Sequence, residues 1–257
     1  DVGIAEDHAI TFACGMALEG LRPFVSVYSS FLQRAYDQLN HDVCRMNLPV
    51  VIGVDRCSII GEDGDSHQGV FDISYMNSLP NMVIAEGKNS SQIEALLDLA
   101  FSQTSPFAIR YPRGSIEYNC DCKCDVALGK WEFVVNNIDS KVSIITYGND
   151  VCKIEKDIND NHLPYNLINA LFIKPIDEEL LVSIGKLNKP IVVYTNDIIK
   201  GGLGDSILEC LNKNHINAPV YILGVDDIYV KHGSVLKVKE SLGLDLNSLY
   251  HFIESIC

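Results

Sequence analysis

A chain of 257 residues, 47% hydrophobic and 21% charged, has the composition of an ordinary globular protein with one large domain or two of moderate size. The formal net charge of −14 argues against binding to nucleic acids or anionic membrane surfaces, because proteins neutralise phosphate groups with Lys and Arg. The sequence has neither an apolar run of the roughly 18 residues that a spanning helix needs nor the regions of a signal peptide. We therefore expect a soluble protein that binds no nucleic acid and no membrane.

In the first half of the chain, short β-branched runs alternate with segments of helical period, a pattern typical of an α/β fold with a mainly parallel sheet. The pattern predicts strands at residues 23–28, 49–55, 82–85 and 107–110. It predicts helices at residues 9–19, 31–45 and 91–102.

Residues 119–140 combine Gly, clustered Cys, Asn and Asp with weak periodicity, which predicts a linker. The alternation then resumes, with strands predicted at 142–147, 166–172, 190–194 and 219–223, and helices at 151–158, 177–184, 202–212 and 246–256. The predicted fold is thus two α/β domains, residues 1–118 and 141–257, each with a mainly parallel sheet flanked by helices.

Nine cysteines are scattered along the chain, an odd number that favours reduced thiols and a reducing compartment over a disulfide framework. Cys120, Cys122 and Cys124 form a cluster whose single-residue gaps are shorter than those of the usual zinc-binding pairs. Thiols in a surface loop are the favoured interpretation of this cluster, and a metal site is the alternative.

Two carboxylates and an imidazole, Glu6, Asp7 and His8, stand together at the start of the first predicted helix. On local grounds alone, the two carboxylates are an acidic first turn that interacts favourably with the positive end of the helix dipole.

All six arginines lie between Arg22 and Arg113. Because the guanidinium fork suits phosphate and carboxylate groups, any anion site belongs to the first domain; a coding bias toward Lys and Asn is an equal alternative explanation of this distribution.

Four segments of the first half resemble the 1-deoxy-D-xylulose-5-phosphate synthase family, a group of transketolase-like enzymes that use thiamine diphosphate; they are GIAEDHAITFACGMA, YSSFLQRAYDQLNHDV, DRCSIIGEDGDSHQGVFD and RYPRG. The second half is similar more weakly, through FIKPIDEELL, GGLGDSILECL and GVDDIYVKHG. The resemblance implies a pyrimidine-binding domain followed by a transketolase C-terminal domain. The family's N-terminal domain, which holds the cofactor diphosphate and Mg²⁺, is missing, and the chain starts at Asp1 without a Met, so we expect a piece of a longer enzyme.

The family condenses pyruvate with D-glyceraldehyde 3-phosphate, with loss of CO₂, to 1-deoxy-D-xylulose 5-phosphate, the first step of non-mevalonate isoprenoid synthesis. The resemblance implies that Glu6 is the catalytic carboxyl group at the cofactor pyrimidine and that Phe31 stacks on that ring. It implies that His67 faces the reacting centre. It also implies substrate contacts, including phosphate contacts from two arginines, for Tyr28, Arg34, Arg56, Asp63 and Arg110.

Several alternatives stay open. Phe31 is otherwise a core aromatic, Asp63 with Asp65 a calcium pair, and Arg113 a structural ion-pair partner. Asp7 replaces the family's usual Gln and either adds a charge beside Glu6 or faces solvent. The rival functions are a transketolase, the pyrimidine-binding subunit of a 2-oxo-acid dehydrogenase, and an inactive self-associating fragment. A homodimer is expected, in the cytoplasm or in a plastid-like organelle.

Overall fold

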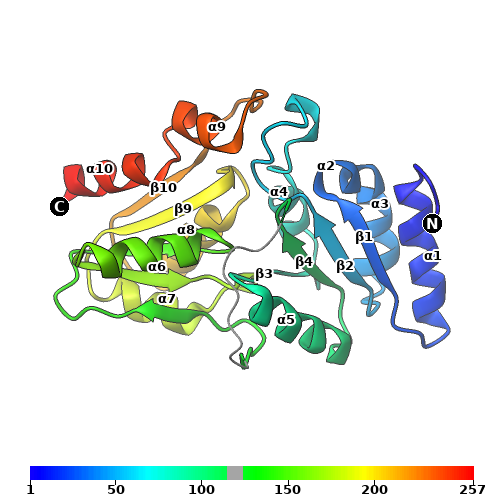
Figure 1. Cartoon of the computed structure of the whole chain (residues 1–257). Coiled ribbons are helices and arrows are strands. Elements are labelled where there is room, and N and C mark those ends of the chain that lie inside the picture. Colours follow the sequence, from blue (N-terminus) through cyan, green and yellow to red (C-terminus); the bar gives the residue numbers. More distant parts are fainter. Residues whose placement is uncertain (115–123) are drawn as a thin grey trace.

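The computed structural model describes residues 1–114 and 124–257. Within these ranges the chain forms two five-stranded sheets flanked by helices, and the two termini lie at opposite ends of the molecule (Figure 1). No helix of the described ranges is both long and apolar enough to cross a membrane. The predicted fold class, two α/β units with mainly parallel sheets, is confirmed.

The first sheet has the strand order β1-β2-β4-β3-β8. Four parallel strands come from the first half of the chain: β1 (Phe24–Tyr28), β2 (Val51–Asp55), β3 (Val83–Glu86) and β4 (Phe107–Tyr111). Strand β8 (Phe172–Lys174) comes from the second half and pairs antiparallel with β3. The sequence pattern predicts one strand at 166–172, whereas the structure divides this region into two strands that belong to different sheets.

The helices of the first unit are α1 (Glu6–Leu18), α4 (Asp72–Asn77), α5 (Ser90–Ser102) and a broken series between β1 and β2. That series consists of α2 (Ser29–Leu32), a 3₁₀ turn (Gln33–Ala35), α3 (Tyr36–Gln38) and a π-helical turn (Leu39–Cys44). A single helix is predicted there, and α4 is not predicted. The turns bring Phe31 onto the ring of Tyr28, the last residue of β1, at the sheet edge where parallel strands collect ligands.

The second sheet has the order β10-β9-β6-β7-β5. Its strands are β5 (Glu132–Val135), β6 (Val142–Thr146), β7 (Tyr165–Asn169), β9 (Ile191–Ile198) and β10 (Val220–Val225), with only the β5–β7 pair antiparallel. Its helices are α6 (Asp150–Asp160), α7 (Glu178–Gly185), α8 (Leu203–Lys213), α9 (Val235–Leu242) and α10 (Leu246–Ile256). Strand β5 lies inside the predicted linker, so part of that segment belongs to the second sheet; α9 is not predicted.

The two units are packed against each other. One hydrophobic cluster contains residues of both, and within it the rings of Phe107 and Phe172 meet edge to face at 6.2 Å. A backbone hydrogen bond of 3.0 Å joins the amide of Ile198 to the carbonyl of Val70. Of the cysteine cluster, Cys120 and Cys122 lie outside the described residues.

Candidate active site

A cavity of about 700 Å³ opens between the first residues of the chain, α1 and β1. Most of its lining is apolar, and its functional side chains are Glu6, Tyr28, Phe31 and Arg34. Glu6 is the first residue of α1, Tyr28 the last residue of β1, and the other two lie on the helical turns that follow. A mostly apolar cavity with a few convergent polar groups is the usual form of a small-molecule site.

The four functional side chains contact one another. Arg34 Nη1 lies 3.3 Å from the carboxylate of Glu6, which is 12% exposed. The same guanidinium lies over the ring of Phe31, at 4.8 Å from its centroid. The rings of Tyr28 and Phe31 stack with their centroids 5.5 Å apart and an interplanar angle of 10°. The cavity therefore combines a flat aromatic surface with a nearly buried carboxylate.

Arg56 and His67 extend this cluster from the long loop after β2. The Arg56 guanidinium lies over the Tyr28 ring, 4.0 Å from its centroid, and forms an ion pair with Asp55. The His67 ring meets Phe31 edge-on at 5.2 Å. Of the residues that the resemblance implies, the structure thus joins six in one contiguous cluster: Glu6, Tyr28, Phe31, Arg34, Arg56 and His67.

Asp63, on the same loop, binds Arg113 rather than a member of the cluster. Arg113 Nη1 lies 2.7 Å from Asp63 Oδ1, and the two side chains are 44% and 31% exposed. The Arg113 guanidinium can therefore still donate hydrogen bonds to a bound anion.

Arg110 has a different environment, because it lies within β4 and its side chain is fully buried. Its guanidinium binds Asp72 at 2.6 Å and Asp197 at 2.8 Å, and it also bonds Glu86. It therefore presents no donor to a ligand from solvent. Arg113, which lies two residues beyond the end of β4, has a guanidinium that is partly exposed instead.

Sequence reasoning did not assign Arg113 to the site. The available signal was its position, since ligand-binding side chains of a parallel sheet gather just beyond the carboxyl ends of the strands. An arginine inside an apolar strand instead faces the interior and needs buried carboxylates as partners.

Three carboxylates around one guanidinium leave an excess of negative charge in the interior. Burial raises the pKa of Glu86 to about 7, although the nearby Arg110 acts in the opposite direction. Burial also raises the pKa of Asp197 above its ordinary value, and Asp72 adds to this effect. The cluster therefore holds a carboxyl group that exchanges a proton near neutral pH.

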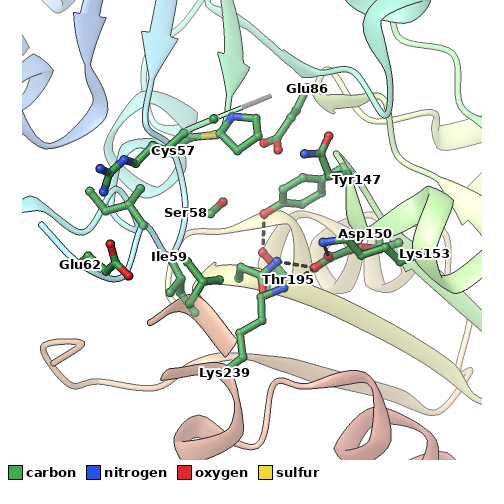
Figure 2. A pocket seen from close by; sticks show the side chains of 18 residues that line it. Cys57, Ser58, Ile59, Glu62, Glu86, Tyr147, Asp150, Lys153, Thr195 and Lys239 are labelled. Atoms are coloured by element: carbon green, nitrogen blue, oxygen red, sulfur yellow. Dashed lines mark hydrogen bonds and ion pairs between the residues drawn. The ribbon is translucent and has the colours of Figure 1, made fainter. Parts of the chain in front are cut away.

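A second cavity, of about 460 Å³, lies between the two units, and Figure 2 shows its lining. Ser58 and Glu86 reach it from the first unit, and Tyr147 and Thr195 from the second. Tyr147 donates a hydrogen bond of 2.7 Å to Asp197, beneath this lining. The cavity wall is therefore built on the same buried network as Arg110.

The two residues that follow Glu6 point outward. Asp7 and His8 are both exposed, and the His8 ring stacks on Phe12 at 6.1 Å. Of the two arrangements considered for Asp7, the structure thus has the solvent-facing one. Among residues 1–114 and 124–257, no group of three or more His, Cys, Asp or Glu side chains is arranged to hold a metal ion.

Comparison with known proteins gives the class to which this fold and site belong. Residues 1–118 match the family described as transketolase, pyrimidine binding domain, and residues 129–249 match transketolase, C-terminal domain. The chain therefore belongs to the transketolase family, with these two domains in this order. A solved split gene transketolase, described as an inactive β4 tetramer, has a TM-score of 0.87 at 25% identity, over 98% of this chain and 82% of that chain.

Within this family the curated relatives are more specific. The chain is 46% identical over 248 residues to the 1-deoxy-D-xylulose-5-phosphate synthase of Clostridium tetani. It is 43% identical over 256 residues to the synthase of the same name in Listeria monocytogenes. The alignments cover 95% and 97% of this chain but 40% and 42% of the relatives, so the chain spans about two fifths of their length. The resemblance inferred from the four motifs is confirmed.

Proposed function

We propose that the chain is part of a thiamine-diphosphate-dependent synthase that condenses pyruvate with D-glyceraldehyde 3-phosphate, releasing CO₂ and 1-deoxy-D-xylulose 5-phosphate. The observation that carries the proposal is one cavity lined by Glu6, Arg34, Phe31 and Tyr28, with Arg56 lying over the Tyr28 ring beside it. The names of the curated relatives support the same reaction.

The residues of the cavity fit the pyrimidine half of the cofactor. Phe31 offers a flat ring for stacking, and Glu6 offers a nearly buried carboxyl group that, when protonated, can donate a hydrogen bond to a ring nitrogen. When bound, the cofactor supplies the carbanion chemistry that joins the two substrates. We assign Mg²⁺ and the cofactor diphosphate to a domain outside this chain.

The acceptor phosphate is assigned to Arg56 and Arg113, since a guanidinium fork binds phosphate oxygens in pairs. Both arginines already have a carboxylate neighbour, Asp55 and Asp63, which limits the directions their forks can take. In this scheme Asp63 accepts a hydrogen bond from an acceptor hydroxyl. His67, edge-on to Phe31, is assigned the role of holding or transferring a proton at the reacting centre.

The test uses the full-length protein with pyruvate and D-glyceraldehyde 3-phosphate, in wild-type form and as Glu6→Gln. We expect turnover to fall at least about 100-fold in the variant, because the amide cannot exchange a proton with the cofactor. Asp7→Asn is the matched control, since Asp7 is the adjacent carboxylate and faces solvent. Near-normal turnover of Glu6→Gln would refute the role of Glu6, and absence of product from the wild type would refute the reaction.

A second proposal concerns the chain on its own, which we infer to be inactive and self-associating. Three large apolar side chains beside the cavity are exposed: Ile4 by 89%, Phe12 by 57% and Phe24 by 46%. Exposed apolar groups gathered at one site mark an interface. The inactive β4 tetramer of the split transketolase supports the same inference.

Light scattering tests this inference. We expect the chain to form at least a dimer at micromolar concentration, and Ile4→Asp to shift it toward the monomer; a monomeric wild type would contradict self-association.

For the cellular compartment we propose the cytoplasm, with a plastid-like organelle as the alternative, because nine cysteines suit reducing conditions. Subcellular fractionation distinguishes the two.

A further inference from the structure

The loop after β2 begins with an unusual backbone conformation. Arg56 and Ser58 are not glycines, yet they have φ angles of 57° and 64°, in the left-handed region. Such a conformation costs free energy and persists only where surrounding contacts enforce it. It also determines the direction in which the Arg56 side chain leaves the main chain, toward the face of Tyr28.

Contacts within the loop itself help to hold Arg56 and Ser58 in the left-handed conformation. Ser58 and Gly69 exchange two backbone hydrogen bonds, of 2.6 and 2.9 Å, which bring the two ends of the loop together. The approach is so close that a Cβ atom on Gly69 would lie 2.1 Å from the carbonyl oxygen of Arg56. The same two hydrogen bonds therefore constrain the start of the loop and its end, where His67 lies.

A contact from the second unit also holds this segment in place. The Ser58 hydroxyl lies 3.1 and 3.2 Å from the two carboxylate oxygens of Asp197, on β9, and donates to them. Asp197 is itself held by Arg110 at 2.8 Å and by Tyr147 at 2.7 Å. Figure 2 shows Ser58 directed toward the Tyr147 side of the cavity between the units. A rigid acceptor from one domain thus binds the strained segment of the other.

We propose that Asp197 and Ser58 are positioning residues: the carboxylate in the C-terminal domain, acting through the Ser58 hydroxyl, holds the loop so that Arg56 and His67 face the acceptor substrate. Neither residue contacts the substrate in this scheme. The inference rests on the proposed function for its kinetic consequence, but the contacts themselves do not depend on it. It gives the C-terminal domain a direct part in binding the phosphorylated acceptor.

Ser58 is the better residue to change, because replacing Asp197 would also disturb the buried charges around Arg110. Ser58→Ala removes the hydroxyl and keeps a side chain for which the left-handed backbone is unfavourable. Ser58→Gly removes the hydroxyl but adopts that backbone without strain. Ser183→Ala is the matched control, since the Ser183 hydroxyl is exposed on α7 and donates a hydrogen bond to the carbonyl of Leu180 in its own helix.

Steady-state kinetics of the full-length protein give the first measurement. We expect Ser58→Ala to raise KM for D-glyceraldehyde 3-phosphate about tenfold, as for a lost hydrogen bond to a charged acceptor, with KM for pyruvate within about twofold of wild type. Ser58→Gly should raise the acceptor KM only about threefold. An unchanged acceptor KM in Ser58→Ala, equal increases for both substrates, or no recovery with Gly would each overturn the proposal.

Amide hydrogen exchange gives a measurement that does not depend on synthase activity. We expect Ser58→Ala, but not Ser183→Ala, to accelerate exchange in residues 56–69, because the Ser58–Gly69 hydrogen bonds would open more often. Unchanged exchange in this segment would overturn the positioning role. A wild type without synthase activity would refute the proposed function, while the exchange result would still decide whether Asp197 and Ser58 hold the loop.

Discussion

The buried Arg110 and the exposed Arg113, three residues apart, should respond oppositely to the same substitution. In Arg110→Met, three buried carboxylates lose their common partner: Asp72, Glu86 and Asp197. Removing one member of a buried ion pair costs about 3–5 kcal/mol in the free energy of unfolding, because the remaining charge is uncompensated. In Arg113→Met, an ion pair that is 44% and 31% exposed is lost, which costs at most about 1 kcal/mol.

Urea unfolding measures this difference. Trp131 is the only tryptophan of the chain, is buried, and donates a hydrogen bond to the carbonyl of Phe172 on β8, so its fluorescence reports on the junction of the units. We expect a large loss of stability in Arg110→Met, a partial loss in Arg110→Lys, which keeps the charge but not the fork, and little change in Arg113→Met.

The enzyme assay should give the reverse order. In the full-length protein, Arg113→Met should raise KM for D-glyceraldehyde 3-phosphate at least about tenfold while leaving stability nearly unchanged. The reasoning is refuted if Arg110→Met unfolds within about 1 kcal/mol of wild type, since three uncompensated buried carboxylates would then have no measurable cost. It is equally refuted if Arg113→Met binds the acceptor normally.

Three further outcomes are expected. The pKa of Glu86, about 7, lies above its ordinary value of 4.5, so the folded state favours the protonated form; stability should fall by up to about 3 kcal/mol as pH rises from about 4.5 to about 7, and unfolding of Glu86→Gln as a function of pH should show a smaller fall. Gly148→Ala should destabilise by more than about 1 kcal/mol, because the new Cβ would lie 2.2 Å from a Glu86 carboxylate oxygen at a φ of 67°; a melting temperature equal to wild type would contradict this steric argument. Arg56→Ala should raise KM for D-glyceraldehyde 3-phosphate far more than KM for pyruvate, and equal effects would count against its phosphate role.

Local patterns were sufficient to predict most of the architecture. The alternation of β-branched runs with helical segments predicted two parallel-sheet units, because both periods are visible within a few residues. The positions after β1 and β2 were also informative, since the carboxyl ends of parallel strands meet at one edge. Glu6, Phe31 and Arg56 are therefore close together in space although they belong to separate motifs.

Other features depend on contacts that leave no local pattern. Strand β8 pairs with the sheet of the other unit, and a short apolar run does not specify its partner. The two arginines of RYPRG differ in burial because one lies inside β4 and the other beyond its end, and strand ends are poorly defined by sequence.

By itself, the sequence determined the fold class and the family, and it singled out the polar and aromatic residues that line the cavity between α1 and β1, because each rests on short-range order or on motifs. Only the tertiary structure decided that Arg110 is an interior ion-pair partner and that Asp197 binds Ser58. Ser58 and Asp197 are 139 positions apart in the sequence. Their contact, like that of Arg110 with Asp197, exists only because the two units pack with buried polar groups opposite one another. A buried polar group needs a hydrogen-bond partner, because burial removes it from water. The local sequence around the group does not specify which residue becomes that partner.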